Sequence, residues 1–162
     1  MATVWSLAKN MEKEGRKFYV KLAASSAHKN VAAVFTLLAK EEARHLAIFE
    51  KLEKGMSAPA GSLTPSMAKA KKIFARLAAR SRQPEIKSGV ESAYKQGLRM
   101  EQETIRHYSG MLKKLDDTQK SALEQIIKEE RNHAKLMEAF IDYAHRPLEW
   151  LENAEFNHLE EY

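Results

Sequence analysis

Two Glu-x-x-His motifs carry the strongest chemical signal in this chain of 162 residues. Glu42 and His45 form the first motif, and Glu130 and His133 form the second. On a helix, a spacing of three residues places both side chains on one face. A carboxylate and an imidazole on one face can bind the same metal ion. A single motif of this kind carries little weight, but its recurrence predicts a metal site.

A further glutamate precedes each motif on the helix expected before it. Glu12 lies 30 positions before Glu42, and Glu101 lies 29 positions before Glu130. All of these glutamates, like the two histidines, interrupt apolar stripes that follow the helical period. We therefore expect six polar side chains to point into a helical core instead of toward solvent.

The two halves of the chain resemble each other around these residues. The segment 11–19, which begins Met-Glu-x-Glu and ends in Tyr19, aligns with 100–108, which begins in the same way and ends in Tyr108. The segment 41–45 aligns with 129–133. Because the matching positions include polar ones, the repeat is more than a shared apolar pattern. It predicts one helical hairpin design used twice.

Four inward carboxylates repel each other and are costly to bury without partners. A pair of metal ions would cancel their charge, with carboxylates bridging the ions and one imidazole on each side. One glutamate from each of two helices, with Glu-x-x-His from each of the other two, is the di-metal pattern of helical bundles. The alternative is a network of buried polar residues that share protons.

The elements that must position these residues are helical. Apolar periodicity predicts helices over about 3–25, 31–52, 66–80, 86–114 and 118–145. The second of these is expected to stop at Gly55, a C-terminal cap. Pro147 is expected to end the helix over 118–145, and a short helix is expected over 147–160. Short turns make neighbouring helices antiparallel, and one long crossover returns the chain along the bundle. The expected fold is all-α, a ferritin-like antiparallel four-helix bundle. We expect one domain over 1–162, divided into a first hairpin (1–54), a crossover (55–85), a second hairpin (86–145) and a C-terminal helix or tail (146–162).

Composition excludes several other classes of function. The chain has no cysteine, which rules out disulfides, thiolate-bound clusters and cysteine nucleophiles. Its net charge is +5, but the basic residues are interleaved with acidic ones, so nucleic acid is not expected as a partner. No apolar run is long enough to span a membrane, and no secretory signal is expected. A cytoplasmic location is expected.

At these motifs the sequence resembles the rubrerythrin family of the ferritin-like superfamily. The resemblance rests on Glu12-Lys-Glu-Gly leading to Phe-Tyr19, on Glu42-Ala-Arg-His45, on Glu101 leading to Tyr108, and on Glu130-Arg-Asn-His133. It implies a non-haem di-iron protein that reacts with hydrogen peroxide or dioxygen. The implied ligands are Glu12, Glu42, Glu101, Glu130, His45 and His133. Tyr19 and Tyr108 would support these ligands from behind, and no catalytic residue is expected beyond the ligands.

The sequence departs from the family pattern at two points. Rubrerythrins typically carry a cysteine-rich module that delivers electrons, which a chain without cysteine cannot supply. They also usually place an extra glutamate three residues after the third-helix ligand, where this chain has Thr104. The expected function is an oxidoreductase that reduces peroxide or dioxygen or oxidises Fe(II), with a separate electron-donor protein. The alternatives are a non-catalytic iron-handling protein and an interaction protein with structural metals, and Mn or Zn could replace the two iron ions.

The remaining histidines fit ordinary roles better than metal binding. The pair Glu155 and His158 has ligand spacing but no matching partner in the other half, and Asp142 with His145 fits the compensation of charge at a helix end. His28 is expected in a turn, and His107 lies off the face of Glu101. Apolar residues after Pro147 could close the bundle or bridge to a second copy, and a homodimer is expected, mainly from the family resemblance.

Overall fold

The chain folds into a bundle of long helices, as expected for an all-α protein. The computed structural model describes residues 3–58, 64–79 and 90–157, with side chains up to residue 145. Within these ranges there are five α-helices and no strand. They are α1 (Val4–Ser25), α2 (Lys29–Glu53), α3 (Pro65–Ala78), α4 (Val90–Met111) and α5 (Asp117–Asn157), with a 3₁₀ turn, η1 (Leu112–Lys114), between the last two.

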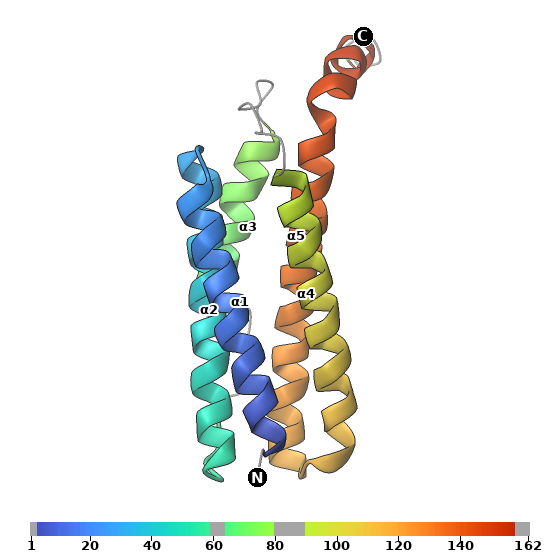
Figure 1. The fold of residues 1–162 in the computed structure, drawn as a ribbon. Coiled ribbons are helices and arrows are strands. Elements are labelled where there is room, and N and C mark those ends of the chain that lie inside the picture. Colours follow the sequence, from blue (N-terminus) through green and yellow to red (C-terminus); the bar gives the residue numbers. More distant parts are fainter. Residues whose placement is uncertain (1–2, 59–63, 80–89, 158–162) are drawn as a thin grey trace.

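The helices pair as two antiparallel hairpins, α1 with α2 and α4 with α5 (Figure 1). The hairpins pack together through α1 against α4 and α2 against α5. Because α2 ends at the lower end of the bundle and α4 begins at the upper end, one long crossover must connect them (Figure 1). Helix α3 lies in this crossover and packs against α2. This arrangement is the connectivity of a ferritin-like bundle.

Local signals in the sequence define where several helices begin and end. Thr3 and Ser6 form a reciprocal capping box at the start of α1, with two hydrogen bonds of 3.1 Å. At the end of α2, Gly55 adopts a φ of +70°, which an L side chain disfavours. The Gly55 amide donates to the Leu52 carbonyl and the Met56 amide to that of Lys51, which is a Schellman cap. The predicted stop at Gly55 is confirmed.

The prediction that Pro147 ends the helix expected over 118–145 is wrong. Helix α5 runs without a break from Asp117 to Asn157, so the separate helix expected over 147–160 is its continuation. The ring of a proline fits the helical φ, and its cost is one missing hydrogen bond and a clash with the preceding turn, which a bend relieves. Figure 1 shows α5 bending near its C-terminal end, beyond the rest of the bundle. The helix expected over 86–114 ends as an α-helix at Met111, and residues 80–89 and 158–162 lie outside the described part.

The apolar core consists of two clusters, one toward each end of the bundle. The cluster toward the α1–α2 turn includes Leu22, Val34, Phe35, Leu38, Met137 and Phe140. The cluster toward the chain's N-terminus includes Trp5, Ala8, Phe49, Leu52, Leu123 and Ile126. Along α2, Leu38 belongs to the first cluster and Phe49 to the second, and Glu42 and His45 lie between them. The polar layer is therefore enclosed by apolar packing above and below.

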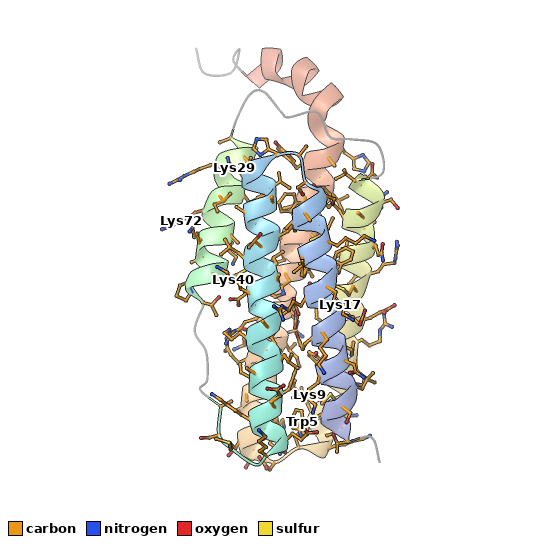
Figure 2. The ribbon with its side chains drawn as sticks, turned by 60° about the vertical axis from the view of Figure 1, so that its left-hand side comes forward. Trp5, Lys9, Lys17, Lys29, Lys40 and Lys72 are labelled. Atoms are coloured by element: carbon orange, nitrogen blue, oxygen red, sulfur yellow. The ribbon has the colours of Figure 1, made fainter. Side chains whose placement is uncertain are left out.

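Charged side chains cover the outside of the bundle. Figure 2 shows Lys17, Lys40 and Lys72 on the outer faces of α1, α2 and α3, where all three are exposed. Among the helices that the structure describes, none combines the length and the hydropathy that crossing a membrane requires.

Candidate metal centre

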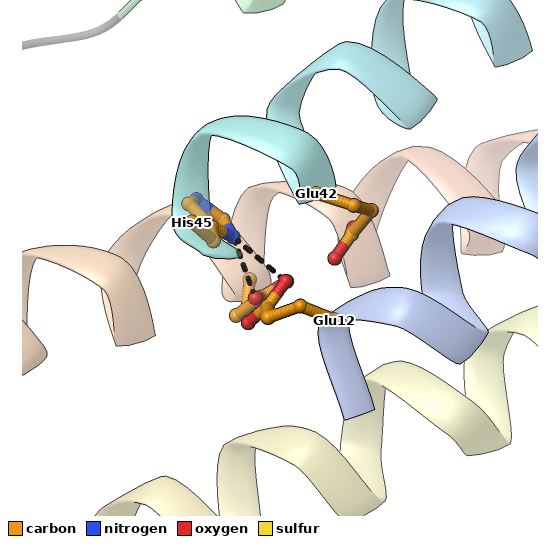
Figure 3. Close-up of side chains that lie close together, drawn as sticks. Glu12, Glu42 and His45 are labelled. Atoms are coloured by element: carbon orange, nitrogen blue, oxygen red, sulfur yellow. Dashed lines mark ion pairs between the residues drawn. The ribbon is translucent and has the colours of Figure 1, made fainter. Parts of the chain in front are cut away.

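The structure brings all six predicted ligand residues together in the polar layer. Helix α1 contributes Glu12 and α4 contributes Glu101, while α2 and α5 each contribute a Glu-x-x-His pair. Their exposed fractions are between 0 and 4%. Each helix presents these residues inward because they replace apolar residues on the stripe that faces the core. In Figure 3 the side chains of Glu12, Glu42 and His45 point toward one another from α1 and α2.

The six residues form two overlapping ligand sets. The first consists of Glu12, Glu42, His45 and Glu130, and the second of Glu42, Glu101, Glu130 and His133. In each set, one donor atom per residue lies within 4.8 Å of the others. Glu42 and Glu130 belong to both sets. If each set held one metal ion, Glu42 and Glu130 would serve both ions.

Both histidines turn the same ring nitrogen toward the carboxylates. The Nδ1 atom of His45 lies 2.9 Å from Glu130 Oε1. It lies 3.5 Å from Glu12 Oε2, a pair that Figure 3 shows. The Nδ1 atom of His133 lies 3.0 Å from Glu42 Oε1 and 3.1 Å from Glu130 Oε2. Glu130 therefore lies between the two imidazoles, whose rings stack with their centroids 5.7 Å apart.

Many of these atoms are buried and lack a hydrogen bond, although they are close to one another. They are Glu12 Oε2, Glu42 Oε1, both carboxylate oxygens of Glu130, and Nδ1 of His45 and of His133. Buried polar atoms in a folded protein are nearly always satisfied, so a converging set of unsatisfied ones needs an explanation. All of them are metal donor atoms directed at a common space. The residues present therefore fit a pair of metal ions.

The electrostatics of the cluster show the mutual repulsion that such ions would relieve. Burial and the charge of Glu130 raise the pKa of Glu101 to about 7, and they also raise the pKa of Glu42 well above its ordinary value. Burial alone would lower the pKa of His45, but the charges of Glu130 and Glu12 outweigh it and raise that pKa well above its usual range. In the metal-free chain, protons held by these groups balance part of the carboxylate charge.

Two tyrosines connect the hairpins through Glu12 and Glu101. We call these two the outer glutamates, because each belongs to only one of the two ligand sets. The Tyr19 hydroxyl donates to Glu101 Oε1, from α1 to α4. The Tyr108 hydroxyl donates to Glu12 Oε1 at 2.5 Å, from α4 to α1. Both side chains are fully buried. Each tyrosine of one half thus donates a hydrogen bond to a carboxylate of the other half.

A glycine on α1 leaves room for one of the shared carboxylates. A Cβ atom at Gly15 would lie 3.2 Å from Glu42 Oε2, closer than Cβ atoms ordinarily approach their neighbours. Gly15 occupies in the first half the position that Thr104 occupies in the second. Thr104 is itself buried, on the turn of α4 that follows Glu101.

Three charged residues beside the cluster were not singled out from the sequence. Glu129 Oε2 lies 2.7 Å from Nε2 of His45, and Arg44 contacts the same carboxylate oxygen through Nη2. Arg44 also lies 3.6 Å from Glu41, which is buried. The signal that could have found them is in the repeat, since an acidic residue directly precedes the inward glutamate in each half, as Glu41 and Glu129. Spacing alone does not show which histidine such a residue reaches.

The other histidines lie away from the cluster. His28 is the N-cap of α2 and accepts a hydrogen bond from the Asn30 amide, and His107 is partly buried outside the ligand sets. His145 pairs with Glu91 at 2.9 Å on the surface, so it compensates charge through another helix instead of through Asp142. The pair Glu155 and His158 falls outside the residues whose side chains the structure describes.

Fold and site together define a class: a four-helix bundle whose core carries two overlapping carboxylate–histidine ligand sets, able to hold metal. The sequence matches the family model of rubrerythrin over residues 6–141. The chain belongs to the rubrerythrin family. No curated protein and no solved structure matched significantly.

Proposed function

We propose that this protein is a di-iron carboxylate oxidoreductase that reduces hydrogen peroxide or dioxygen, or oxidises Fe(II). The observation that carries the proposal is the sharing of Glu42 and Glu130 by two ligand sets, each completed by one histidine and one outer glutamate. Glu12, Glu42, His45, Glu101, Glu130 and His133 are the proposed ligands. Family membership supports iron as the metal, although the same donors accept Mn or Zn.

A pair of Fe(II) ions bound there would supply two electrons, one from each ion, for the reduction of one hydrogen peroxide and two protons to two waters. The chain's own part is to hold the ligands and to exclude water. Tyr19 and Tyr108 hold Glu101 and Glu12 in place by hydrogen bonds. The two apolar clusters, which include Leu38 and Phe49 of α2, close the layer above and below.

Repeated turnover requires a source of electrons that this sequence does not contain. It has no cysteine, so a thiolate-bound redox centre cannot be built from it. We propose that a separate electron-donor protein returns the two electrons after each cycle. A homodimer in the cytoplasm, with no nucleic acid or membrane partner, completes the proposal.

A second candidate function is a non-catalytic iron-handling protein whose metals are mainly structural. Two features favour it: the missing cysteines, and buried Thr104 in place of the glutamate that the family resemblance leads one to expect there. In the family that this chain resembles, that glutamate serves a ligand change linked to the oxidation state of the metal, and a threonine hydroxyl cannot replace a carboxylate in it. This candidate predicts bound metal without reaction toward peroxide.

The test is anaerobic reconstitution of the full chain with Fe(II), followed by elemental mass spectrometry and rapid mixing with hydrogen peroxide. We expect about two ions per chain and one peroxide consumed for each pair of Fe(II) oxidised. Two ions without oxidation would support the iron-handling alternative. No bound metal would mean that the six residues form a proton-sharing network, and the di-iron proposal would fall.

A further inference from the structure

The two histidines of the metal centre differ in the hydrogen-bond partner of Nε2, the ring nitrogen that points away from the carboxylate cluster. Nε2 of His45 faces Glu129 Oε2 at 2.7 Å, across the interface between α2 and α5. Glu129 is 4% exposed, and its carboxylate also receives Arg44 from α2. His45 is therefore the first member of a chain of contacts that continues through buried Glu129 to partly exposed Arg44.

His133 has no equivalent support among the described residues. Its Nε2 atom is buried and makes no hydrogen bond. The repeat places Glu41 where Glu129 stands in the other half, yet Glu41 Oε2 is also buried without a hydrogen bond. The position equivalent to Arg44 is Asn132, which cannot supply a positive charge. The two halves, nearly alike at the ligands, differ directly behind them.

The group Glu41, His45 and Glu129 also lies close enough together to suggest a third metal position. Arg44 argues against that reading, because its guanidinium already lies against Glu129 and 3.6 Å from Glu41. A cation placed there would have to displace a positive charge that is already paired. Glu129 is therefore better explained as a hydrogen-bond partner of His45 than as a ligand of a third ion.

We propose that Glu129, held by Arg44, is a positioning residue that makes the metal position of Glu12 and His45 bind more tightly than that of Glu101 and His133. This inference rests on the proposed metal centre. By accepting the Nε2 proton, Glu129 fixes the tautomer in which Nδ1 is free to bind metal, and it holds the ring toward Glu12 and Glu130. His133 must be ordered without such a partner.

The loss of a carboxylate that supports a metal-bound histidine typically costs about 10- to 100-fold in metal affinity. We therefore expect two resolvable binding steps in the full chain, with the first ion at the position of His45. Glu129→Gln is expected to lower the affinity for that ion by about 10-fold or more and to leave the affinity for the second ion unchanged. The two positions then become similar in affinity.

The experiment is an anaerobic titration with Co(II), whose absorption reports each bound ion, on the full chain and on paired variants. Glu129→Gln is placed in His133→Ala, where the ion at His45 remains, and in His45→Ala, where the other ion remains. We expect the Co(II) affinity to fall by about 10-fold or more in the His133→Ala background and to change by less than about 2-fold in the His45→Ala background. A general loss of structure would weaken binding in both backgrounds. Glu41→Gln is the matched control, since it removes the equivalent buried carboxylate, and it is expected to leave both ions in place.

If Glu129→Gln does not fold, Arg44→Gln tests the same chain of contacts. It is expected to lower the affinity for the ion at His45 by a smaller factor. Equal losses in the two histidine backgrounds, no loss in either, or a third ion that disappears in Glu129→Gln would each overturn this inference. In those cases the metal centre itself would stand, because the unmodified chain would still bind two ions. An unmodified chain that takes up no Co(II) would overturn both the inference and the proposed function.

Discussion

The Tyr19 hydroxyl on α1 donates a hydrogen bond to Glu101 on α4, which ties the first helical hairpin to a proposed ligand of the second. Both side chains are almost fully buried. Burial and the neighbouring charge of Glu101 raise the pKa of Tyr19 well above its ordinary value, so the hydroxyl stays protonated and remains a donor. Tyr108 and Glu12 repeat this relationship in the opposite direction. The outer carboxylates are thus held in place before any metal binds.

Replacement of Tyr19 by phenylalanine keeps the ring but removes this donor. A buried carboxylate that loses a hydrogen bond costs about 1–3 kcal/mol, so we expect the free energy of unfolding of the metal-free chain to fall by about that amount. Urea denaturation in the presence of a chelator measures it. Tyr108→Phe is the matched variant and should behave similarly through Glu12. An unchanged free energy of unfolding in both variants would mean that these hydrogen bonds do not support the site.

Simultaneous replacement of Glu130 and His133 by alanine removes one shared carboxylate and one imidazole. We expect the variant to lose at least one of the two bound ions, as measured by elemental mass spectrometry after reconstitution. The matched control is Glu91→Ala with His145→Ala, which removes a surface Glu–His pair at 2.9 Å and should leave the metal content unchanged. Unchanged stoichiometry in the first variant would show that the proposed ligand set is wrong.

The close approach of Gly15 to Glu42 predicts a change in which stability and metal affinity move in different directions. Alanine is favoured over glycine within a helix by about 1 kcal/mol, so Gly15→Ala should not lower the free energy of unfolding of the metal-free chain. Its Cβ atom would lie 3.2 Å from Glu42 Oε2 and would shift a carboxylate shared by both ligand sets. Because metal–ligand bonds form only within a narrow range of distances, a displaced Glu42 carboxylate should weaken Co(II) binding.

Gly110→Ala is the control for this experiment, because a Cβ atom there would meet nothing within 4 Å. It should leave Co(II) affinity unchanged. Gly15→Ala with wild-type affinity would indicate that Glu42 has space to move without leaving either metal position.

Metal affinity is expected to rise with pH. In the metal-free chain, nearby carboxylates raise the pKa of His133 well above its ordinary value despite burial, and the pKa of Glu101 is about 7. These groups must release protons before they can bind metal, so protons compete with the ion as pH falls. Calorimetric titration with Co(II) between about pH 6 and about pH 8, in buffers of different ionisation enthalpy, measures affinity and proton release together. Affinity that does not depend on pH would contradict the titration of these groups on binding.

Much of the site could be predicted from the sequence because the helical period determines which face a residue occupies. Glu42 and His45 share a face whatever the helix packs against, and apolar neighbours four residues away show that this face is buried. The internal repeat then identified the second pair, Glu130 and His133. The same reasoning predicted an all-α fold with one long crossover, and the stop of α2 at Gly55.

Only the tertiary structure determined the contacts between the two hairpins. The period of a single helix does not encode which side chains from another hairpin it meets, because that depends on how the helices pack. The sharing of Glu42 and Glu130 by two ligand sets, the bonds that Tyr19 and Tyr108 make across the bundle, and the reach of Glu129 to His45 all lie between helices distant in sequence. The continuation of α5 through Pro147 was likewise not predictable from local sequence, since a proline stops one helix and only bends another, depending on whether the surrounding chain permits the bend.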